Sequence, residues 1–378
     1  MSNGLKIYIL CSLTFTSLLL SEELVYEYAI HQGANLISFP LISENYEIDY
    51  YFSDLNNNLI TGSPIESNII SLITEGELTF FSDDVWVGSL SEINSKKGYW
   101  LISDQEMTFL LTGENLTENI YYMHPGGNLI SYPFSQEQSY YDAIPIVTDN
   151  ISAIIGENEA LYNNNGILIG SLTTFRPGKG YWFIVNDYTP FQYSMPSLSS
   201  NINHPDVLIR EDELLDYNQS TLQSVFFIEK IYFSGNINED SIELKAKCNE
   251  NIVGQSTWNE EFSDIIAMGN DGFSYSIEYC SNNDEVSIEN NQIPFYILDG
   301  TNSWQSNSFE ILTLSDCDYG DVNFSHSLNI SDVVLLIEHI TSTSPFSNNH
   351  QLILADLNQD YNINVSDIII TVDQILNN

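Results

Sequence analysis

Short runs of apolar and aromatic residues, separated by turn-forming residues, recur along most of this chain. Residues 36–39 (LISF) and 99–102 (YWLI) are two such runs, bounded by glycine, asparagine, proline and lysine. Short apolar runs between such turns predict β-strands. Residues 333–340 and 368–375 follow a different pattern, with longer apolar stretches that are compatible with helices. The chain is therefore predicted to be mainly β and to end in a small helical module.

The strand-like part begins with an internal repeat. Residues 31–40 (HQGANLISFP) recur as residues 124–133 (HPGGNLISYP), and each copy closes on Gly-Tyr-Trp, at residues 98–100 and 180–182. The separation of the copies falls from 93 residues at the first motif to 82 at the last. The first copy therefore contains extra residues, which we place in the asparagine-rich stretch 54–63. This self-similarity predicts two tandem β modules.

Repeated polar residues are the first candidates for a functional site. They are His31 and His124, the glutamates of two turn motifs (Glu75, Glu77, Glu157 and Glu159), and Lys97 with Lys179. Gly76 and Asn158 lie between those glutamates, and both residue types tolerate positive φ, which predicts the same turn twice. A catalytic role needs a base, an acid and a pocket in defined geometry. We therefore interpret the repeated polar residues as caps of turns and strand ends.

Tryptophan side chains offer a second candidate chemistry, the stacking of sugar rings. Trp100 and Trp182 follow the repeated Gly-Tyr pairs, and Trp258 and Trp304 lie further along the chain. We expect all four in β cores or at their edges, whereas exposed coplanar rings would indicate carbohydrate binding. Residues 28–195 resemble the duplicated modules with G-x-N-L-I-S and G-Y-W motifs that occur in secreted proteins of marine bacteria. That resemblance implies no particular activity.

A third β module is predicted beyond a linker rich in serine, asparagine and proline at residues 197–211. Alternating polar and apolar residues and an apolar run at residues 293–298 predict the strands of a β-sandwich-like module over residues 212–315. Residues 218–227 (NQSTLQSVFF) resemble β modules that precede attachment domains in secreted bacterial proteins.

Charge and the N-terminus indicate where the protein works. The chain carries 52 acidic and 9 basic residues, a formal net charge of −43. Such a surface repels phosphate backbones and anionic lipid, so neither nucleic acid nor a membrane surface is expected as a partner. Lys6 precedes an apolar run at residues 7–20, which predicts a signal peptide over residues 1–24, and no later segment suits a membrane span. We expect a secreted protein, extracellular or at the cell surface.

Cysteine pairing follows from that location, because oxidising compartments permit disulfides. Cys11 is expected to leave with the signal peptide. Cys248 and Cys280 are predicted to pair within the third module, although a pairing that uses the surplus Cys317 stays open.

Oxygen-bearing residues occupy alternate positions in the stretch DLNQDYNINVSD at residues 356–367. Calcium takes six to eight oxygen ligands, and a short loop supplies them from positions one, three, five, seven, nine and twelve, the seventh through its backbone carbonyl. Those positions hold Asp356, Asn358, Asp360, Asn362, Asn364 and Asp367. Thirty-five residues earlier the same frame holds Asp321, Asn323, Ser325, Ser327, Asn329 and Asp332. The duplicated frame predicts two Ca²⁺ loops, each followed by a helix.

The two frames differ in quality. His326 and Tyr361 occupy the sixth position, where glycine usually provides the sharp turn. Loop one has Ser325 where loop two has Asp360, so loop one has fewer anionic ligands. We therefore predict a calcium site in loop two and a weak or empty one in loop one.

Residues 317–378 resemble the type I dockerin family in this duplicated loop–helix pattern. The resemblance implies a calcium-binding module, here residues 316–378, that docks to a cohesin-like module or a cell-surface scaffold. It also implies that the residues after the ninth ligand and on the face of the following helix contact the partner, namely Ile330, Ser331, Val365 and Ser366 with nearby helix positions. Because the two copies are nearly identical at these places, the resemblance allows the partner to bind in either of two orientations.

The predicted organisation is two tandem repeat modules, at residues 25–114 and 115–196, then the sandwich-like module and the dockerin-like module. We expect a secreted, non-catalytic modular protein that docks to a partner. The alternative is an accessory or catalytic component of polysaccharide degradation, either carbohydrate-binding or associated with O-glycosyl hydrolases. No segment has the length and pattern of a recognisable hydrolase barrel.

Overall fold

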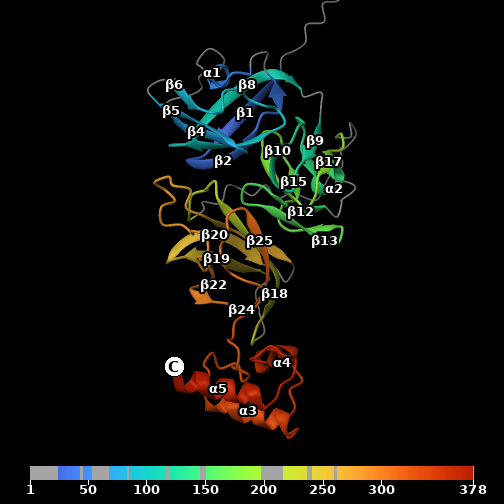
Figure 1. Cartoon of the computed structure of the whole chain (residues 1–378), viewed down its shortest axis with the longest axis vertical. Coiled ribbons are helices and arrows are strands. Elements are labelled where there is room, and N and C mark those ends of the chain that lie inside the picture. Colours follow the sequence, from blue (N-terminus) through green and yellow to red (C-terminus); the bar gives the residue numbers. More distant parts are fainter. Residues whose placement is uncertain are drawn as a thin grey trace, which may run out of the picture.

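The computed structural model describes residues 24–42, 46–52, 68–82, 85–115, 119–144, 150–196, 216–235, 241–258 and 262–377. The predicted signal peptide up to residue 23, with Cys11, the linker at 197–211 and the stretch 54–63 lie outside the described residues. The described part is mainly β and ends in a helical module, which confirms the predicted fold class (Figure 1). None of its helices is long and apolar enough to cross a membrane.

The first repeat combines two antiparallel sheets. The larger has the strand order β2-β7-β4-β5-β6, and the smaller has the order β1-β8-β3. The elements are β1 (Leu24–Ile30), β2 (Gly33–Ser38), β3 (Leu41–Ile42), α1 (Ile48–Phe52), β4 (Ile69–Thr74), β5 (Glu77–Ser82), β6 (Val85–Gly88), β7 (Gly98–Ser103) and β8 (Met107–Asn115). Phe39 lies at the centre of an aromatic core, where its ring contacts those of Tyr51, Phe52 and Tyr99.

The second repeat reproduces the larger sheet strand for strand, in the order β10-β16-β12-β13-β14. Its elements are β9 (Ile120–Met123), β10 (Gly126–Ser131), β11 (Gln138–Ser139), α2 (Tyr140–Ala143), β12 (Ile151–Ile155), β13 (Ala160–Asn164), β14 (Ile167–Ile169), β15 (Thr174–Phe175), β16 (Gly180–Val185) and β17 (Thr189–Gln192). Gly76 and Asn158 have φ values of 79° and 58°, which confirms the prediction of equivalent turns.

The repeats pack against each other through equivalent strands. Strands β2 and β7 of the first meet β10 and β16 of the second, and the backbone bridges Ile37–Lys179 and Lys97–Ile130 are reciprocal. Glycine at position 180 permits this approach. A Cβ there would lie 2.8 Å from the Ile37 carbonyl oxygen and 3.1 Å from the Cα of Gly98.

The third module is a sandwich of two four-stranded sheets, with the orders β21-β18-β25-β24 and β20-β19-β22-β23. Its strands are β18 (Gln223–Tyr232), β19 (Ile242–Cys248), β20 (Asn251–Trp258), β21 (Ser263–Met268), β22 (Ser287–Asn290), β23 (Ile293–Pro294), β24 (Tyr296–Asp299) and β25 (Ser308–Ser315). Cys248 and Cys280 form a disulfide, and Cys317 is free and buried.

The prediction of a single strand at residues 293–298 is wrong, because the structure divides this stretch between the two sheets. Strand β23 pairs with β22, whereas β24 pairs with β25. Pro294, which has no amide hydrogen, is the last residue of β23, and the chain crosses to the other sheet directly after it, at Phe295. The apolar run therefore carries the chain from one layer of the sandwich to the other.

The sandwich packs directly on the second repeat. The ring of Tyr162 on β13 lies 5.5 Å from that of Phe227 and 5.5 Å from that of Phe309. The carboxylate of Asp264 accepts hydrogen bonds from the backbone amide and the hydroxyl of Ser171, at 2.6 and 2.7 Å. The three β modules are thus joined by buried contacts.

The helical module follows β25 and contains α3 (Ile330–Ile340), α4 (Asn349–Ala355) and α5 (Val365–Asn377). Helix α4 occupies the segment that the sequence pattern predicted only as a connection between the two loop–helix units. Its His350 is 3% exposed, stacks 5.1 Å from the ring of Tyr232 on β18 and bonds the Ser315 hydroxyl at 2.9 Å. These contacts seat the module on the end of the sandwich (Figure 1).

Candidate calcium loops and docking face

The first and last predicted ligand residues of loop one, Asp321 and Asp332, are buried and accept hydrogen bonds from the backbone of the loop. Asp332 accepts hydrogen bonds from the backbone amides of Asn323 and Asn329, at 3.1 and 3.0 Å. Asp321 accepts one from the amide of Ser325 at 3.0 Å. Asp321 and Asp332 are 1% and 0% exposed, so two carboxylates are buried in one short loop.

Two further oxygens of loop one are buried without a hydrogen-bond partner, Oδ2 of Asp321 and Oδ1 of Asn323. A buried acceptor left unsatisfied costs about 1–3 kcal/mol. Burial raises the pKa of Asp332, and the charge of Asp321 adds to that effect, against the lowering by backbone hydrogen bonds. A divalent cation would satisfy these oxygens and offset the two charges. These residues therefore fit calcium. Their burial supports a calcium site in loop one more strongly than the sequence pattern of the loop does.

Loop two has the same pattern of hydrogen bonds, but its ligand residues are more exposed to solvent. Asp367 is buried and accepts from the backbone amides of Asn358 and Asn364, at 3.4 and 2.8 Å. Asp356 accepts from the amide of Asp360 at 3.1 Å. In both loops, the carboxylates at the first and last ligand positions thus accept hydrogen bonds from backbone amides at equivalent positions. The remaining predicted ligand residues, Ser327 of loop one and Asn362 of loop two, lie exposed in the same loops.

The sixth position of each loop has the backbone conformation that glycine would favour. His326 has a φ of 55° and Tyr361 a φ of 65°. A left-handed conformation costs an L-residue roughly 1–2 kcal/mol. The loops therefore form the expected sharp turn without glycine.

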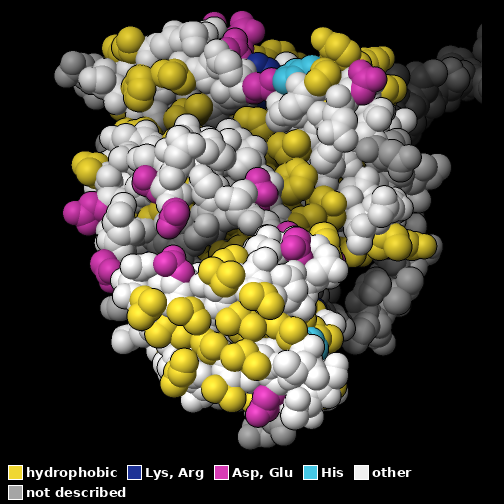
Figure 2. Space-filling model, turned by 60° about the horizontal axis from the view of Figure 1, so that its bottom comes forward, with side chains coloured by type: hydrophobic (Ala, Val, Ile, Leu, Met, Phe, Trp, Pro, Cys, Tyr) yellow, Lys and Arg dark blue, Asp and Glu magenta, His cyan; other side chains and the backbone are white. Residues whose placement is uncertain are grey.

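The predicted partner residues lie on an exposed apolar face of α3 and α5. Ile330 is 66% exposed and Val365 60%, and Ser331 and Ser366 beside them are also exposed. The face continues along both helices through Val334, Ile337, Ile369 and Leu376, helix positions that the sequence analysis expected to take part but did not name individually. Figure 2 shows this broad hydrophobic patch on the C-terminal module. Helical spacing from residues 330 and 365 was the signal available for finding the added residues.

The repeated polar residues have a role that the sequence did not predict, because they bind across the two repeats. Glu157 of the second repeat accepts from His31 at 2.7 Å, from the backbone amide of Leu36 at 2.9 Å and from Lys179 at 3.0 Å. Burial favours the neutral acid, but Lys179 and His31 hold the pKa of Glu157 well below its ordinary value. These residues therefore join strands of different repeats, in addition to forming local turn contacts.

The reciprocal contact is present on the other side of the interface. His124 of the second repeat binds Glu75 of the first, and Lys97 binds Glu77 at 2.7 Å. The backbone carbonyl of Pro125 and the carboxylate of Glu75 raise the pKa of His124. This placement is structural, since the groups are paired with each other at an interface between two modules.

The tryptophans are packed in or against cores. Trp100, Trp258 and Trp304 are 2%, 6% and 1% exposed, and Trp182 is half-buried against the sandwich. Trp304 donates its indole hydrogen to the carbonyl of Ala267 at 2.9 Å. None of the four offers the exposed coplanar surface that a sugar-binding platform needs.

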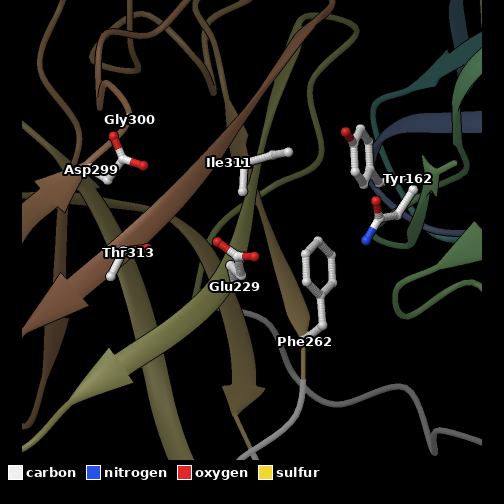
Figure 3. Close-up of a pocket in the computed structure, with 8 residues that line it drawn as sticks. Tyr162, Glu229, Phe262, Asp299, Gly300, Ile311 and Thr313 are labelled. Carbon is white, nitrogen blue, oxygen red and sulfur yellow. The ribbon is translucent and has the colours of Figure 1, made fainter. Parts of the chain in front are cut away.

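A cavity of about 300 Å³ lies between the second repeat and the sandwich. Figure 3 shows the rings of Tyr162 and Phe262 toward one side and the carboxylates of Glu229 and Asp299 toward the other. Aromatic faces and carboxylates are groups that can contact sugar rings and hydroxyls.

The comparisons with known proteins bear on the C-terminal module alone. No curated protein matches the chain. The dockerin type I domain family matches residues 319–376, which contain both loops and all three helices of the module. The match confirms the expected similarity of the C-terminal module to the dockerin type I domain family, whose members bind calcium and dock to cohesins.

Proposed function

We propose that this is a secreted, non-catalytic modular protein that attaches through its dockerin module to a cohesin-type partner. The observation that carries the proposal is the exposed apolar face of α3 and α5, which begins directly after each calcium loop. Contiguous apolar surface of this kind marks an interaction site. The disulfide between Cys248 and Cys280 and the strongly acidic chain support an extracellular location.

Calcium binding and docking are linked through the loop ends. Asn329 and Asp332 form a capping box at the start of α3, so the closing ligand of loop one also fixes the first turn of the helix that carries Ile330. When bound, calcium supplies positive charge to carboxylates that are buried together. Closing the loop therefore orders the edge of the docking face.

Calcium titration of the full chain tests the first half of the proposal. We expect two saturable sites by calorimetry, with one lost in Asp321→Ala and the other in Asp356→Ala. Asp373→Ala is the matched control, because Asp373 is an exposed aspartate of α5 outside the loops. Unchanged calcium stoichiometry in both loop variants would exclude these loops as the sites.

Binding to a panel of immobilised cohesin modules tests the second half. Ile330→Asp and Val365→Asp each change one helix, and we expect the double variant to lose binding by about 100-fold or more because hot-spot residues dominate interfaces. A partner held in two orientations would tolerate either single change. Val85→Asp, at a 57% exposed valine of the first repeat, serves as the control. No binding to any cohesin, or binding that the double variant retains, contradicts the docking role.

The alternative proposal, a polysaccharide-associated role, draws on the cavity beside Tyr162 and Phe262. In that case soluble glycans should bind the full chain in calorimetry, and Phe262→Ala should weaken the binding about tenfold. A chain that binds none of a broad glycan panel would leave docking as the function.

A further inference from the structure

Three side chains of different ligand chemistry meet where the dockerin module joins the sandwich. The thiol of Cys317, a ring nitrogen of His326 and a carboxylate oxygen of Asp316 all lie within 4.8 Å of one another. Asp316 and Cys317 begin the helical module directly after β25, whereas His326 occupies the sixth position of calcium loop one. The cluster therefore joins the start of the module to loop one, and Asp316 is also hydrogen-bonded to Ser234 of the sandwich.

The separation of sulfur and nitrogen agrees with tetrahedral coordination. Cys317 Sγ lies 3.6 Å from His326 Nδ1. Zinc bonds of about 2.3 Å to sulfur and 2.0–2.1 Å to nitrogen, at a tetrahedral angle, place the two ligand atoms about 3.6 Å apart. The same separation also suits a hydrogen bond between thiol and imidazole, so the test must distinguish the two.

The surroundings already hold the third ligand in place. Both carboxylate oxygens of Asp316 accept from the backbone amide of Ser234 at 2.9 Å, and one also accepts from its hydroxyl at 2.7 Å. Hydrogen bonds of this kind orient a metal-binding carboxylate while leaving it lone pairs. The imidazole of His326 is exposed, which gives an ion access to the buried thiol.

Loop one also places histidine where calcium loops usually have glycine. His326 has a φ of 55°, a conformation that an L-residue adopts at a cost, so its side chain brings no local conformational benefit to the turn. The imidazole does make contacts beyond the loop, because its Nδ1 lies 3.6 Å from the thiol sulfur of Cys317 and 3.1 Å from the carbonyl oxygen of Asp316. A metal bound to Nδ1 would replace the contact with the carbonyl. The histidine thus connects the loop to the chain segment that enters it.

We propose that Cys317, His326 and Asp316 bind Zn²⁺ or a similar borderline-soft divalent cation and thereby clamp calcium loop one to the sandwich. Thiolate and imidazole ligands select this class of metal over calcium, which prefers oxygen. Water completes the fourth position. Binding displaces the proton of the thiol to solvent. The consequence is a fixed orientation of the docking face relative to the β modules.

The test uses the full chain with a Cys11→Ser background, so that Cys317 is the free thiol, and with calcium in excess to saturate the oxygen sites. Co²⁺ is the spectroscopic probe, because its bond to a thiolate produces an intense charge-transfer absorption. We expect one equivalent of Co²⁺ to give that band and Zn²⁺ to abolish it by displacement. Zn²⁺ should also raise the melting temperature.

Variants of the two strongest ligands decide the assignment. Cys317→Ser should abolish the band, and His326→Asn should weaken Zn²⁺ binding on the order of 100-fold. His326→Asn keeps a residue that tolerates positive φ at an exposed position, so it tests the site even if the Cys317 variant fails to fold. His124→Asn, at another exposed histidine, is the matched control and should bind as the parent does. Absence of the band, or equal Zn²⁺ affinity in parent and His326→Asn, overturns the proposal. Neither outcome depends on cohesin binding, so it is separable from the docking role.

Discussion

The outer hairpins of the two repeats have the same fold and opposite surroundings. In the first repeat, Phe80 on β5 pairs with Val87 on β6, and the two are 43% and 58% exposed. In the second, the equivalent pair is Tyr162 on β13 and Ile169 on β14. Tyr162 is covered by the aromatic side chains of the sandwich, whereas nothing that the structure describes covers Phe80 in that way.

This difference teaches that the internal repeat specifies strands and interface, and that the neighbouring module decides which outer face is buried. Both hairpins present apolar residues at these positions, so polarity alone does not distinguish them. The interface between the repeats is more symmetric, because both repeats make the same kind of contact there. Each repeat contributes a histidine to a glutamate of the other, and only the degree of burial differs.

The largest expected effect comes from truncating the covered hairpin. Tyr162→Ala should lower the free energy of unfolding by about 2–4 kcal/mol, because it removes an aromatic ring packed against Phe227 and Phe309. Phe80→Ala should change it by less than about 1 kcal/mol, because that ring is already in water to a large extent. Urea unfolding of the two variants measures the difference.

Phe80→Ala serves as the matched control for Tyr162→Ala, since both shorten an aromatic residue at equivalent positions. Equal destabilisation by the two changes would mean that the sandwich contributes nothing to the second repeat. Packing on the sandwich would then not distinguish the stability of the two hairpins.

A smaller effect is expected at the two interface glutamates. Glu157→Gln should destabilise the chain by about 1.5–3 kcal/mol, because a side chain only 14% exposed loses charged hydrogen bonds to His31 and Lys179. Glu75→Gln, at a side chain 37% exposed, should cost less than about 1 kcal/mol. An equal cost for both would contradict the asymmetry of burial.

The histidine partners give these pairs a pH dependence. The pKa values of His31 and His124 are raised above 6.5, so their contribution is complete below pH 6.5 and is lost as the pH rises through the raised values. Glu157 has a lowered pKa, so its contribution is present above pH 4.5 and falls away in stronger acid. The free energy of unfolding of the parent and of His31→Gln should be measured at several pH values, and we expect the difference between the two to become smaller above pH 6.5. A difference that stays constant into the alkaline range would exclude titration of His31 as its source.

Much of the architecture was accessible from local pattern. Short apolar runs between turn residues predicted β2 and β7, and the equivalence of Gly76 and Asn158 predicted the shared turn. The spacing of oxygen-bearing residues predicted both calcium frames. Each rests on residues close in sequence, where spacing translates directly into geometry. Pattern failed at residues 293–298, because a run of one composition was divided between two sheets.

The sequence by itself determined the strand-rich composition, the duplication and the loop–helix units that identify the dockerin module. Only the tertiary structure decided that His31 meets Glu157, that Tyr162 is covered while Phe80 is not, and that His326 reaches Cys317. The physical reason is distance along the chain. Interactions within a turn follow from local spacing, whereas a contact between modules depends on how whole sheets pack, which no single stretch of residues encodes.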